Sequence, residues 1–143
     1  MNNRGFSLIE TIIYLALFSV IIGGGMVGVY QIVDSNNKNL AATAMEQEAN
    51  FLLRKINWAL TGATDAIAPN SQTLNITKGG NSYLFDFNDK YLRLDGAELN
   101  NDTAPVESLS FVSAPADGAK PASITAKFTI KGHLFETTKH LRQ

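Results

Sequence analysis

Few residues of this 143-residue chain have the types and spacing that catalysis or metal binding requires. The chain contains no cysteine, which excludes disulfides, thiol catalysis and Cys-based zinc sites. The two histidines, His133 and His140, are too few and too far apart to predict a metal cluster or a His-dependent relay. No Gly-rich phosphate loop or nucleophile-base arrangement stands out. The sequence therefore predicts a protein that is not an enzyme and that holds no metal or other cofactor.

Three carboxylates, Asp86, Asp89 and Asp95, lie at or near predicted hairpin turns. Carboxylate oxygens are ligands for calcium, but these three do not have the spacing of a calcium-binding loop. Aspartate is also a common turn former, because its side chain bonds to the nearby backbone. Calcium binding is therefore a weaker alternative to a role in the turns.

Glu10 is the one charged residue between Phe6 and Val33, in an apolar run of about 28 residues. An unpaired carboxylate inside a membrane costs several kcal/mol, so it needs protonation, access to the headgroups or a partner. The run holds no basic residue, and a cation would have to come from a chain terminus or from another molecule. The alternative is a single-pass anchor whose Glu10 reaches the lipid headgroups. These residues alone leave both interpretations open.

The apolar run is long enough to cross a membrane once. As a helix with a rise of about 1.5 Å per residue, residues 12 to 33 cover about 33 Å, close to the hydrocarbon thickness of a bilayer. A secretory signal peptide has a shorter apolar region, of about 7 to 15 residues. Arg4 is the only cation before the run, so the positive-inside rule places Met1 in the cytoplasm and the chain after Val33 outside.

The residues around Glu10 also form a motif. The string from Gly5 to Glu10, GFSLIE, resembles the processing motif of type IV prepilins and pseudopilins. The resemblance implies that a prepilin peptidase cuts between Gly5 and Phe6 at the cytoplasmic face of the inner membrane and methylates the new Phe6 amine. It also implies that Glu10 pairs with the terminal amine of an adjacent subunit, which relieves two desolvated charges together. The implied partners are the peptidase, other pilin or pseudopilin subunits, an inner-membrane assembly platform and membrane lipid.

Helical spacing continues beyond the apolar run. Between residues 34 and 60, apolar side chains recur at intervals of three and four and form one stripe, and Gly62 follows as a helix stop. We therefore expect one helix from about Ser7 to Thr61, about 80 Å long, with an apolar first half and an amphipathic second half. Trp58 is expected to pack in the core beside this stripe.

Two glycines of the apolar run, Gly24 and Gly28, have the small-xxx-small spacing that lets membrane helices approach closely. They predict a helix-packing face in a filament. Glycine also weakens a helix by up to about 1 kcal/mol per residue in water, so the same segment is an alternative place for bending or local melting.

Alternating and β-rich segments follow the helix and predict an antiparallel meander of about five or six strands. The segments are residues 73–77, 82–87, 91–94, 106–113, 123–131 and 134–141. A long helix followed by hairpins indicates an α+β fold of the type IV pilin-like kind, with the amphipathic half of the helix packed on the antiparallel sheet. The expected core residues are Leu74, Ile76, Leu84, Phe111, Ile124, Phe128 and Ile130.

The expected organisation has four parts. They are a cleaved leader at 1–5, a transmembrane and filament-core helix at 6–33, its amphipathic continuation at 34–62 and a sheet domain at 63–143.

Charge is nearly balanced overall but is divided along the chain. The formal net charge is -1, so long-range attraction to nucleic acid is not predicted to be the main activity. Residues 34–119 carry 6 basic and 11 acidic residues, whereas residues 120–143 carry 5 basic residues and 1 acidic residue. The predicted basic surface of the last strands consists of Lys127, Lys131, Lys139 and Arg142. These residues could contact DNA phosphates or a partner; the alternatives are that they solvate a sheet edge or pair with an acidic neighbouring subunit.

Two further strings refine the resemblance. Residues 47–56 and 135–143 are similar to the helix and the terminal strand of J-type minor pseudopilins of type II secretion and of W-type minor pilins. We therefore interpret the chain as a minor pilin or pseudopilin, a non-catalytic subunit of a type IV pilus, competence or type II secretion filament. It would be anchored once in the inner membrane, with its C-terminal domain outside the cytoplasm. The alternatives are a major pilin subunit and a membrane-tethered DNA- or protein-binding domain that does not polymerise.

Overall fold

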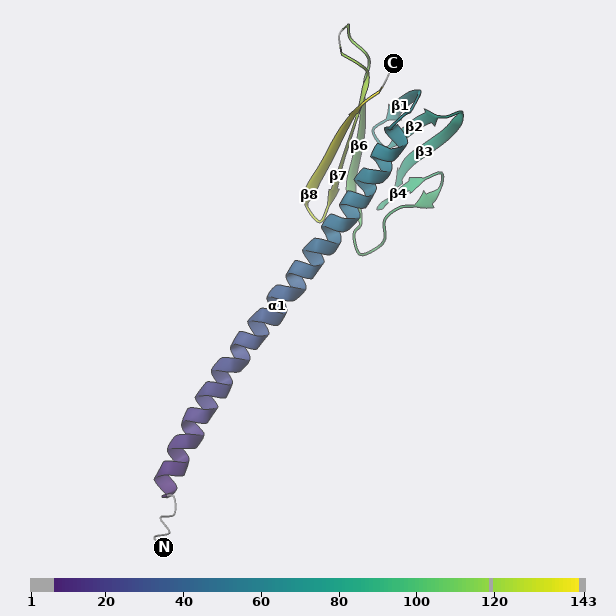
Figure 1. The fold of residues 1–143 in the computed structure, drawn as a ribbon. Helices are drawn as coiled ribbons and strands as arrows, with labels where there is room; N and C mark the ends of the chain where they lie inside the picture. Colours follow the sequence, from purple (N-terminus) through teal and green to yellow (C-terminus); the bar gives the residue numbers. More distant parts are fainter. Residues whose placement is uncertain (1–6, 119, 142–143) are drawn as a thin grey trace. The chain divides into compact units, whose positions relative to one another are not determined.

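The computed structural model describes residues 7–118 and 120–141, and Figure 1 shows its elements. In this part of the chain, one helix, α1 (Leu8–Leu60), precedes eight strands. The strands are β1 (Asp65–Asn70), β2 (Thr73–Lys78), β3 (Asn81–Asn88), β4 (Tyr91–Leu94), β5 (Ala97–Glu98), β6 (Val106–Ala114), β7 (Ser123–Ile130) and β8 (His133–His140). The chain forms two compact units that divide between Ala42 and Thr43.

Both ends of α1 follow local sequence signals. The backbone amide of Glu10 donates to Ser7 Oγ over 3.3 Å, so Ser7 caps the first turn. At the other end, Gly62 has a φ of 75°, a left-handed conformation that glycine adopts without steric cost and that commonly ends a helix. The predicted helix from about Ser7 to Thr61 is confirmed.

The first unit is helix from Leu8 to Ala42, and none of the side chains in this range is buried. The large apolar side chains between Leu8 and Val33 are 48 to 83% exposed. By length and composition, α1 is able to cross a membrane. This part of α1 therefore presents a continuous apolar surface that its own unit does not cover.

Two antiparallel sheets follow α1 in the second unit. β1 to β5 form one sheet in chain order, and β6 to β8 form the other. The six predicted strand segments are confirmed as β2, β3, β4, β6, β7 and β8, but they belong to two sheets rather than to one meander. The sequence does not predict β1 or β5, because β5 has only two residues and β1 contains Pro69, near which its register with β2 shifts. Proline is tolerated in β1 because β1 is an edge strand.

Two-residue turns join neighbouring strands. Gly79 and Gly80 connect β2 to β3 with φ values of 57° and 80°. Lys131 and Gly132 connect β7 to β8 with φ values of 49° and 76°. Positive φ at both positions is typical of the tight turns that match the twist of a hairpin.

Buried side chains of α1 and of both sheets form one core. The helix contributes Met45, Ala49, Leu52, Ile56, Ala59 and Leu60. The largest buried side chains of the two sheets are Phe85 and Phe128. Figure 1 shows the last turns of α1 running along the strands of both sheets. The expected α+β class, with an amphipathic helical segment on antiparallel sheets, is confirmed.

Two of the core predictions are wrong. Leu84 is 40% exposed, and its neighbour Phe85 is buried instead. Phe85 lies opposite the buried Leu74 in the β2–β3 pair, so these two share the inner face and Leu84, one residue earlier, points to the other face. Trp58 is 49% exposed. It lies two residues after the buried Ile56, and two steps along a helix place its side chain about 160° around the helix axis from that of Ile56.

Candidate functional site

Glu10 lies in the first turn of α1, where the partial positive charge of a helix N-terminus favours a carboxylate. Its Oε1 accepts a hydrogen bond from the Tyr14 hydroxyl over 3.3 Å. Tyr14 does not follow from the sequence reasoning, which sought a charged partner, although the four-residue helical spacing was an available signal. Gly5 and Phe6, the predicted cleavage and methylation residues, lie outside the described residues.

Gly24 and Gly28 lie one helical turn apart in the exposed apolar part of α1. A Cβ atom added at either position would meet no atom within 4 Å beyond its chain neighbours and the local backbone of the helix. The space beside both glycines is therefore open to another molecule, as a helix-packing face requires.

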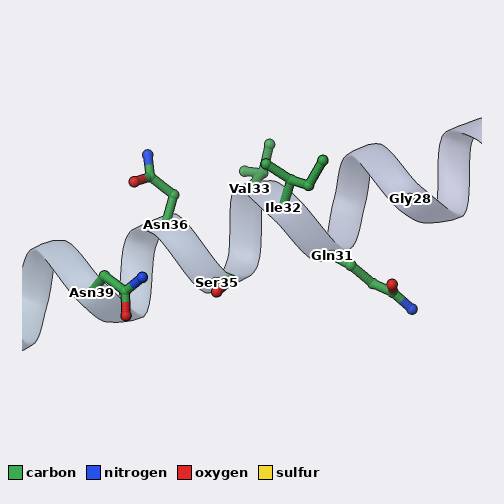
Figure 2. A pocket seen from close by; sticks show the side chains of 7 residues that line it. All are labelled: Gly28, Gln31, Ile32, Val33, Ser35, Asn36 and Asn39. Carbon is green, nitrogen blue, oxygen red and sulfur yellow. The ribbon is translucent and has the colours of Figure 1, made fainter.

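A shallow hollow lies along α1 where the apolar run ends, and Figure 2 shows the residues that line it. Its lining residues are Gly28, Gln31, Ile32, Val33, Ser35, Asn36 and Asn39. In Figure 2 the Ile32 and Val33 side chains point to one side of the helix and Gln31 points to the other. One helix does not enclose a ligand in the way a binding cleft does. The hollow therefore marks the change from apolar to polar residues and is not a candidate active site.

The predicted basic surface of the last strands consists of Lys127, Lys131, Lys139 and Arg142, of which Arg142 lies outside the described residues. Lys127 is exposed and forms an ion pair with Glu136 at 3.3 Å across the β7–β8 pair. Lys139 lies opposite the buried Ile124 and therefore belongs to the inner face of the sheet. Lys131 occupies the β7–β8 turn. The structure does not bring the described lysines of this set onto one face.

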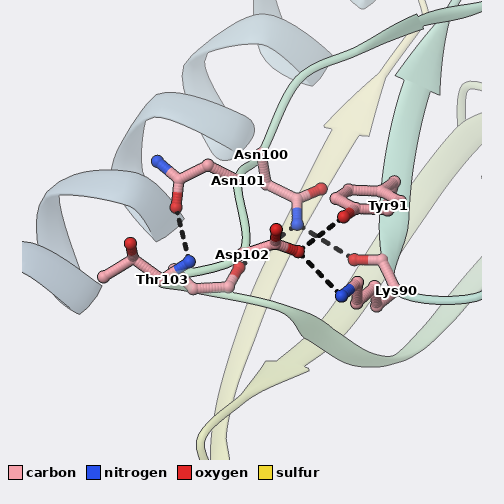
Figure 3. A network of polar contacts seen from close by, with 7 residues as sticks. Lys90, Tyr91, Asn100, Asn101, Asp102 and Thr103 are labelled. Carbon is pink, nitrogen blue, oxygen red and sulfur yellow. Dashed lines mark hydrogen bonds and ion pairs between the residues drawn. The ribbon is translucent and has the colours of Figure 1, made fainter.

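A network of polar contacts fixes the loop between β5 and β6, as Figure 3 shows. Asn100, at its centre, is 5% exposed. Its Nδ2 donates to the backbone oxygens of Lys90, at 2.9 Å, and Ala104, at 3.2 Å. Its Oδ1 accepts from the backbone amide of Leu92 over 2.8 Å. One buried side chain thus satisfies three backbone groups and ties the loop to the start of β4.

Asp102 is the charged member of this network. It accepts hydrogen bonds from Lys90 Nζ at 2.7 Å and from the Tyr91 hydroxyl at 2.5 Å. The hydrogen bond from Lys90, followed by that from Tyr91, lowers the pKa of Asp102, and the bonds to Asp102 raise the pKa of Lys90 and the pKa of Tyr91. Because the Asp102 side chain is 75% exposed, these shifts indicate a surface structural ion pair.

The aspartates considered for calcium have other contacts. Arg93 Nε donates to Asp86 Oδ2 over 2.9 Å, and Arg93 Nη2 contacts the same oxygen. Asp95 Oδ1 accepts from the Leu84 amide over 2.8 Å, and Asp89 has a φ of 58° in the β3–β4 turn. Within residues 7–118 and 120–141, no group of three or more His, Cys, Asp or Glu side chains is placed to hold a metal ion. The contacts of these aspartates are those of hairpin and turn residues.

Comparison with known protein families finds a match at the start of the chain. The model of the prokaryotic N-terminal methylation motif matches residues 1–26. The chain carries a prepilin-type N-terminus. No curated protein and no solved structure matches the chain significantly.

The prepilin-type motif supports a type IV pilin-like or pseudopilin-like protein, and this motif points to a structural subunit rather than an enzyme. It implies processing by a prepilin peptidase and assembly with other pilins. The exposed apolar part of α1, which begins within the matched residues, indicates membrane anchoring.

Proposed function

We propose that this prepilin-type protein is a minor pilin or pseudopilin, a non-catalytic subunit of a filament assembled from the inner membrane. The observation that carries the proposal is the position of Glu10. It is the one charged side chain between Leu8 and Val33, the exposed, membrane-length apolar part of α1, which begins inside a prepilin-type motif. The resemblance of residues 47–56 and 135–143 to J-type and W-type minor subunits supports the minor role.

Maturation follows from the motif under this proposal. Residues 1–5 are a leader, and cleavage between Gly5 and Phe6 leaves a methylated Phe6 as the N-terminus. Residues 6–33 form the membrane-spanning and filament-core segment, residues 34–62 form its amphipathic continuation, and residues 63–143 form the sheet domain outside the cytoplasm. The large apolar side chains from Leu8 to Val33, which are at least 48% exposed, then exchange lipid for the helices of neighbouring subunits.

Glu10 has one set of partners before assembly and another after it. In the single chain, the helix N-terminus and the Tyr14 hydroxyl stabilise the carboxylate. In the filament, the carboxylate neutralises the terminal amine of an adjacent subunit. Removing one partner of such a desolvated pair costs about 3 to 5 kcal/mol, because the remaining charge is left buried. The pairing of Glu10 therefore fixes the register between neighbouring subunits. Gly24 and Gly28 give neighbouring helices room to approach.

The experiment that tests this function is Glu10→Ala in cells that hold the assembly machinery. Membrane insertion and cleavage should persist, since neither needs the carboxylate, whereas crosslinks to other pilin subunits should fall strongly. Tyr14→Phe is the matched control, because it removes the hydroxyl but leaves the carboxylate available to a neighbouring amine. We expect its crosslinks to remain close to those of the wild type.

Undiminished crosslinking by Glu10→Ala would contradict the proposed pairing. That result would favour the alternative in which Glu10 reaches the headgroups of a lone anchor. The protein would then be a membrane-tethered binding domain that does not polymerise.

A further inference from the structure

An aromatic and basic surface lies on the last turns of α1 and the neighbouring residues of β2 and β3. We call it the Trp58 patch, and its members are Phe51, Arg54, Lys55, Trp58, Lys78 and Tyr83. The Trp58 ring is 49% exposed and meets the Tyr83 ring edge-on, with the ring centroids 5.6 Å apart. Four members, Phe51, Arg54, Lys55 and Trp58, line a shallow hollow. A ring expected in the core is thus presented to solvent beside cations.

Two ammonium groups lie close to the indole. Lys78 Nζ lies 4.6 Å from the centroid of the Trp58 ring, and Lys55 Nζ lies 6.0 Å from it and 5.5 Å from the centroid of Phe51. Lys78 also donates to the Trp58 backbone oxygen over 2.7 Å, which fixes its position at the end of α1. Arg54 is exposed on the same side of the helix.

No ion pair among the described residues neutralises the positive charge of the Trp58 patch. The ion pairs among the described residues join Lys38 to Asp34, Lys90 to Asp102, Arg93 to Asp86 and Lys127 to Glu136. They include none of the three patch cations. The patch is therefore a local basic surface within residues 34–119, where acidic residues outnumber basic ones by 11 to 6. It is complementary to an anionic partner.

The composition of the patch distinguishes between a protein partner and a nucleic acid. Protein interfaces are enriched in arginine and aromatic residues but depleted in lysine. Two of the three patch cations are lysines, and lysine commonly contacts phosphates. Exposed aromatic rings beside cations are also how proteins hold single strands, because unpaired bases stack on the rings while the cations follow the backbone. The composition therefore favours nucleic acid.

We propose that the Trp58 patch binds single-stranded nucleic acid. An unpaired base stacks on Trp58, and Arg54 and Lys55 contact the flanking phosphates. Lys78 remains against the indole and orients it. This activity goes beyond subunit assembly and does not depend on it.

The test uses the full-length protein in detergent micelles and a fluorescently labelled oligothymidylate. Trp58 is the only tryptophan of the chain, so quenching of its fluorescence reports directly on stacking. We expect quenching together with increased probe anisotropy, and an affinity that falls steeply as salt is raised. The double variant Arg54→Gln, Lys55→Gln should bind about tenfold more weakly or worse, and its salt slope should fall by about 0.7 for each lost phosphate contact.

Two further variants separate the patch from general basic charge. The matched control Lys127→Gln, Lys131→Gln removes the same charge from β7 and its turn, and its affinity should stay within about twofold of the wild type. Trp58→Leu should weaken binding about tenfold without changing the salt slope, since it removes stacking but no phosphate contact. Circular dichroism melting confirms that each variant is folded.

Four results would overturn the proposal. The first is no quenching and no anisotropy change at low salt, and the second is equal weakening by the patch and control double variants. Equal binding of a DNA duplex would show that no base stacks on Trp58. Displacement of the probe by polyglutamate at the same charge concentration would identify an acidic protein as the partner instead.

Discussion

Asn100→Ala should destabilise the second unit by about 3 to 5 kcal/mol. The change leaves the Leu92 amide without its partner in a buried position, which costs about 1 to 3 kcal/mol. It also removes the hydrogen bonds to the carbonyl oxygens of Lys90 and Ala104, worth about 1 kcal/mol each. The total is a large part of the roughly 5 to 15 kcal/mol that stabilises a typical domain.

Urea unfolding of the full chain in micelles, followed by Trp58 fluorescence, measures this loss. Asn101→Ala is the matched control, because the Asn101 side chain is exposed and accepts a single hydrogen bond, from the Thr103 amide over 2.9 Å. Its expected cost is below about 1 kcal/mol. Equal shifts in the unfolding midpoint for the two variants would refute the view that the buried amide holds the β5–β6 loop.

Three smaller predictions use the same unfolding assay. Phe85→Ala should cost about 3 to 5 kcal/mol and Leu84→Ala less than about 1, and the reverse order would mean that the assigned β2–β3 register is wrong. The pKa of Asp102 is lowered in the folded state, so its ion pair adds stability at pH values above 3.8, the ordinary pKa of an aspartate. The stability advantage of the wild type over Asp102→Asn should therefore disappear as the pH falls through the folded-state pKa of Asp102. A stability difference that persists in strong acid would contradict this prediction. Lys78→Met should cost about 1 kcal/mol, because the cation is lost from the end of α1 and from the face of Trp58, and no change would show that these contacts add nothing.

Periodicity explains how much of the fold was predictable. Local patterns predicted α1 and six of the eight described strands. These patterns are the apolar run, the stripe of apolar side chains at intervals of three and four residues, and the β-rich segments. The division into two sheets was not predictable, because it depends on which strands pair and not on their sequences alone. Leu84 and Phe85 show where local patterns fail: they are apolar neighbours in one strand, and only the pairing with Leu74 decides which is buried.

Long-range contacts explain what the sequence missed at the candidate sites. The Asn100 side chain bonds to Lys90, ten residues earlier, and the Trp58 patch joins α1 to Lys78 on β2. No spacing rule signals such pairs. Tyr14 was within reach of sequence reasoning, since a residue four positions along a helix lies on the same face as Glu10.

The most direct test of the central claim is the mass and N-terminal sequence of the mature protein, purified from cells that contain an active prepilin peptidase. The proposed function predicts a protein that lacks residues 1–5 and begins with N-methylated Phe6. Gly5→Leu should accumulate as the full-length, membrane-inserted precursor, because a side chain at this position obstructs the peptidase. A wild-type protein that still begins at Met1 in the same cells would contradict the assignment as a processed filament subunit.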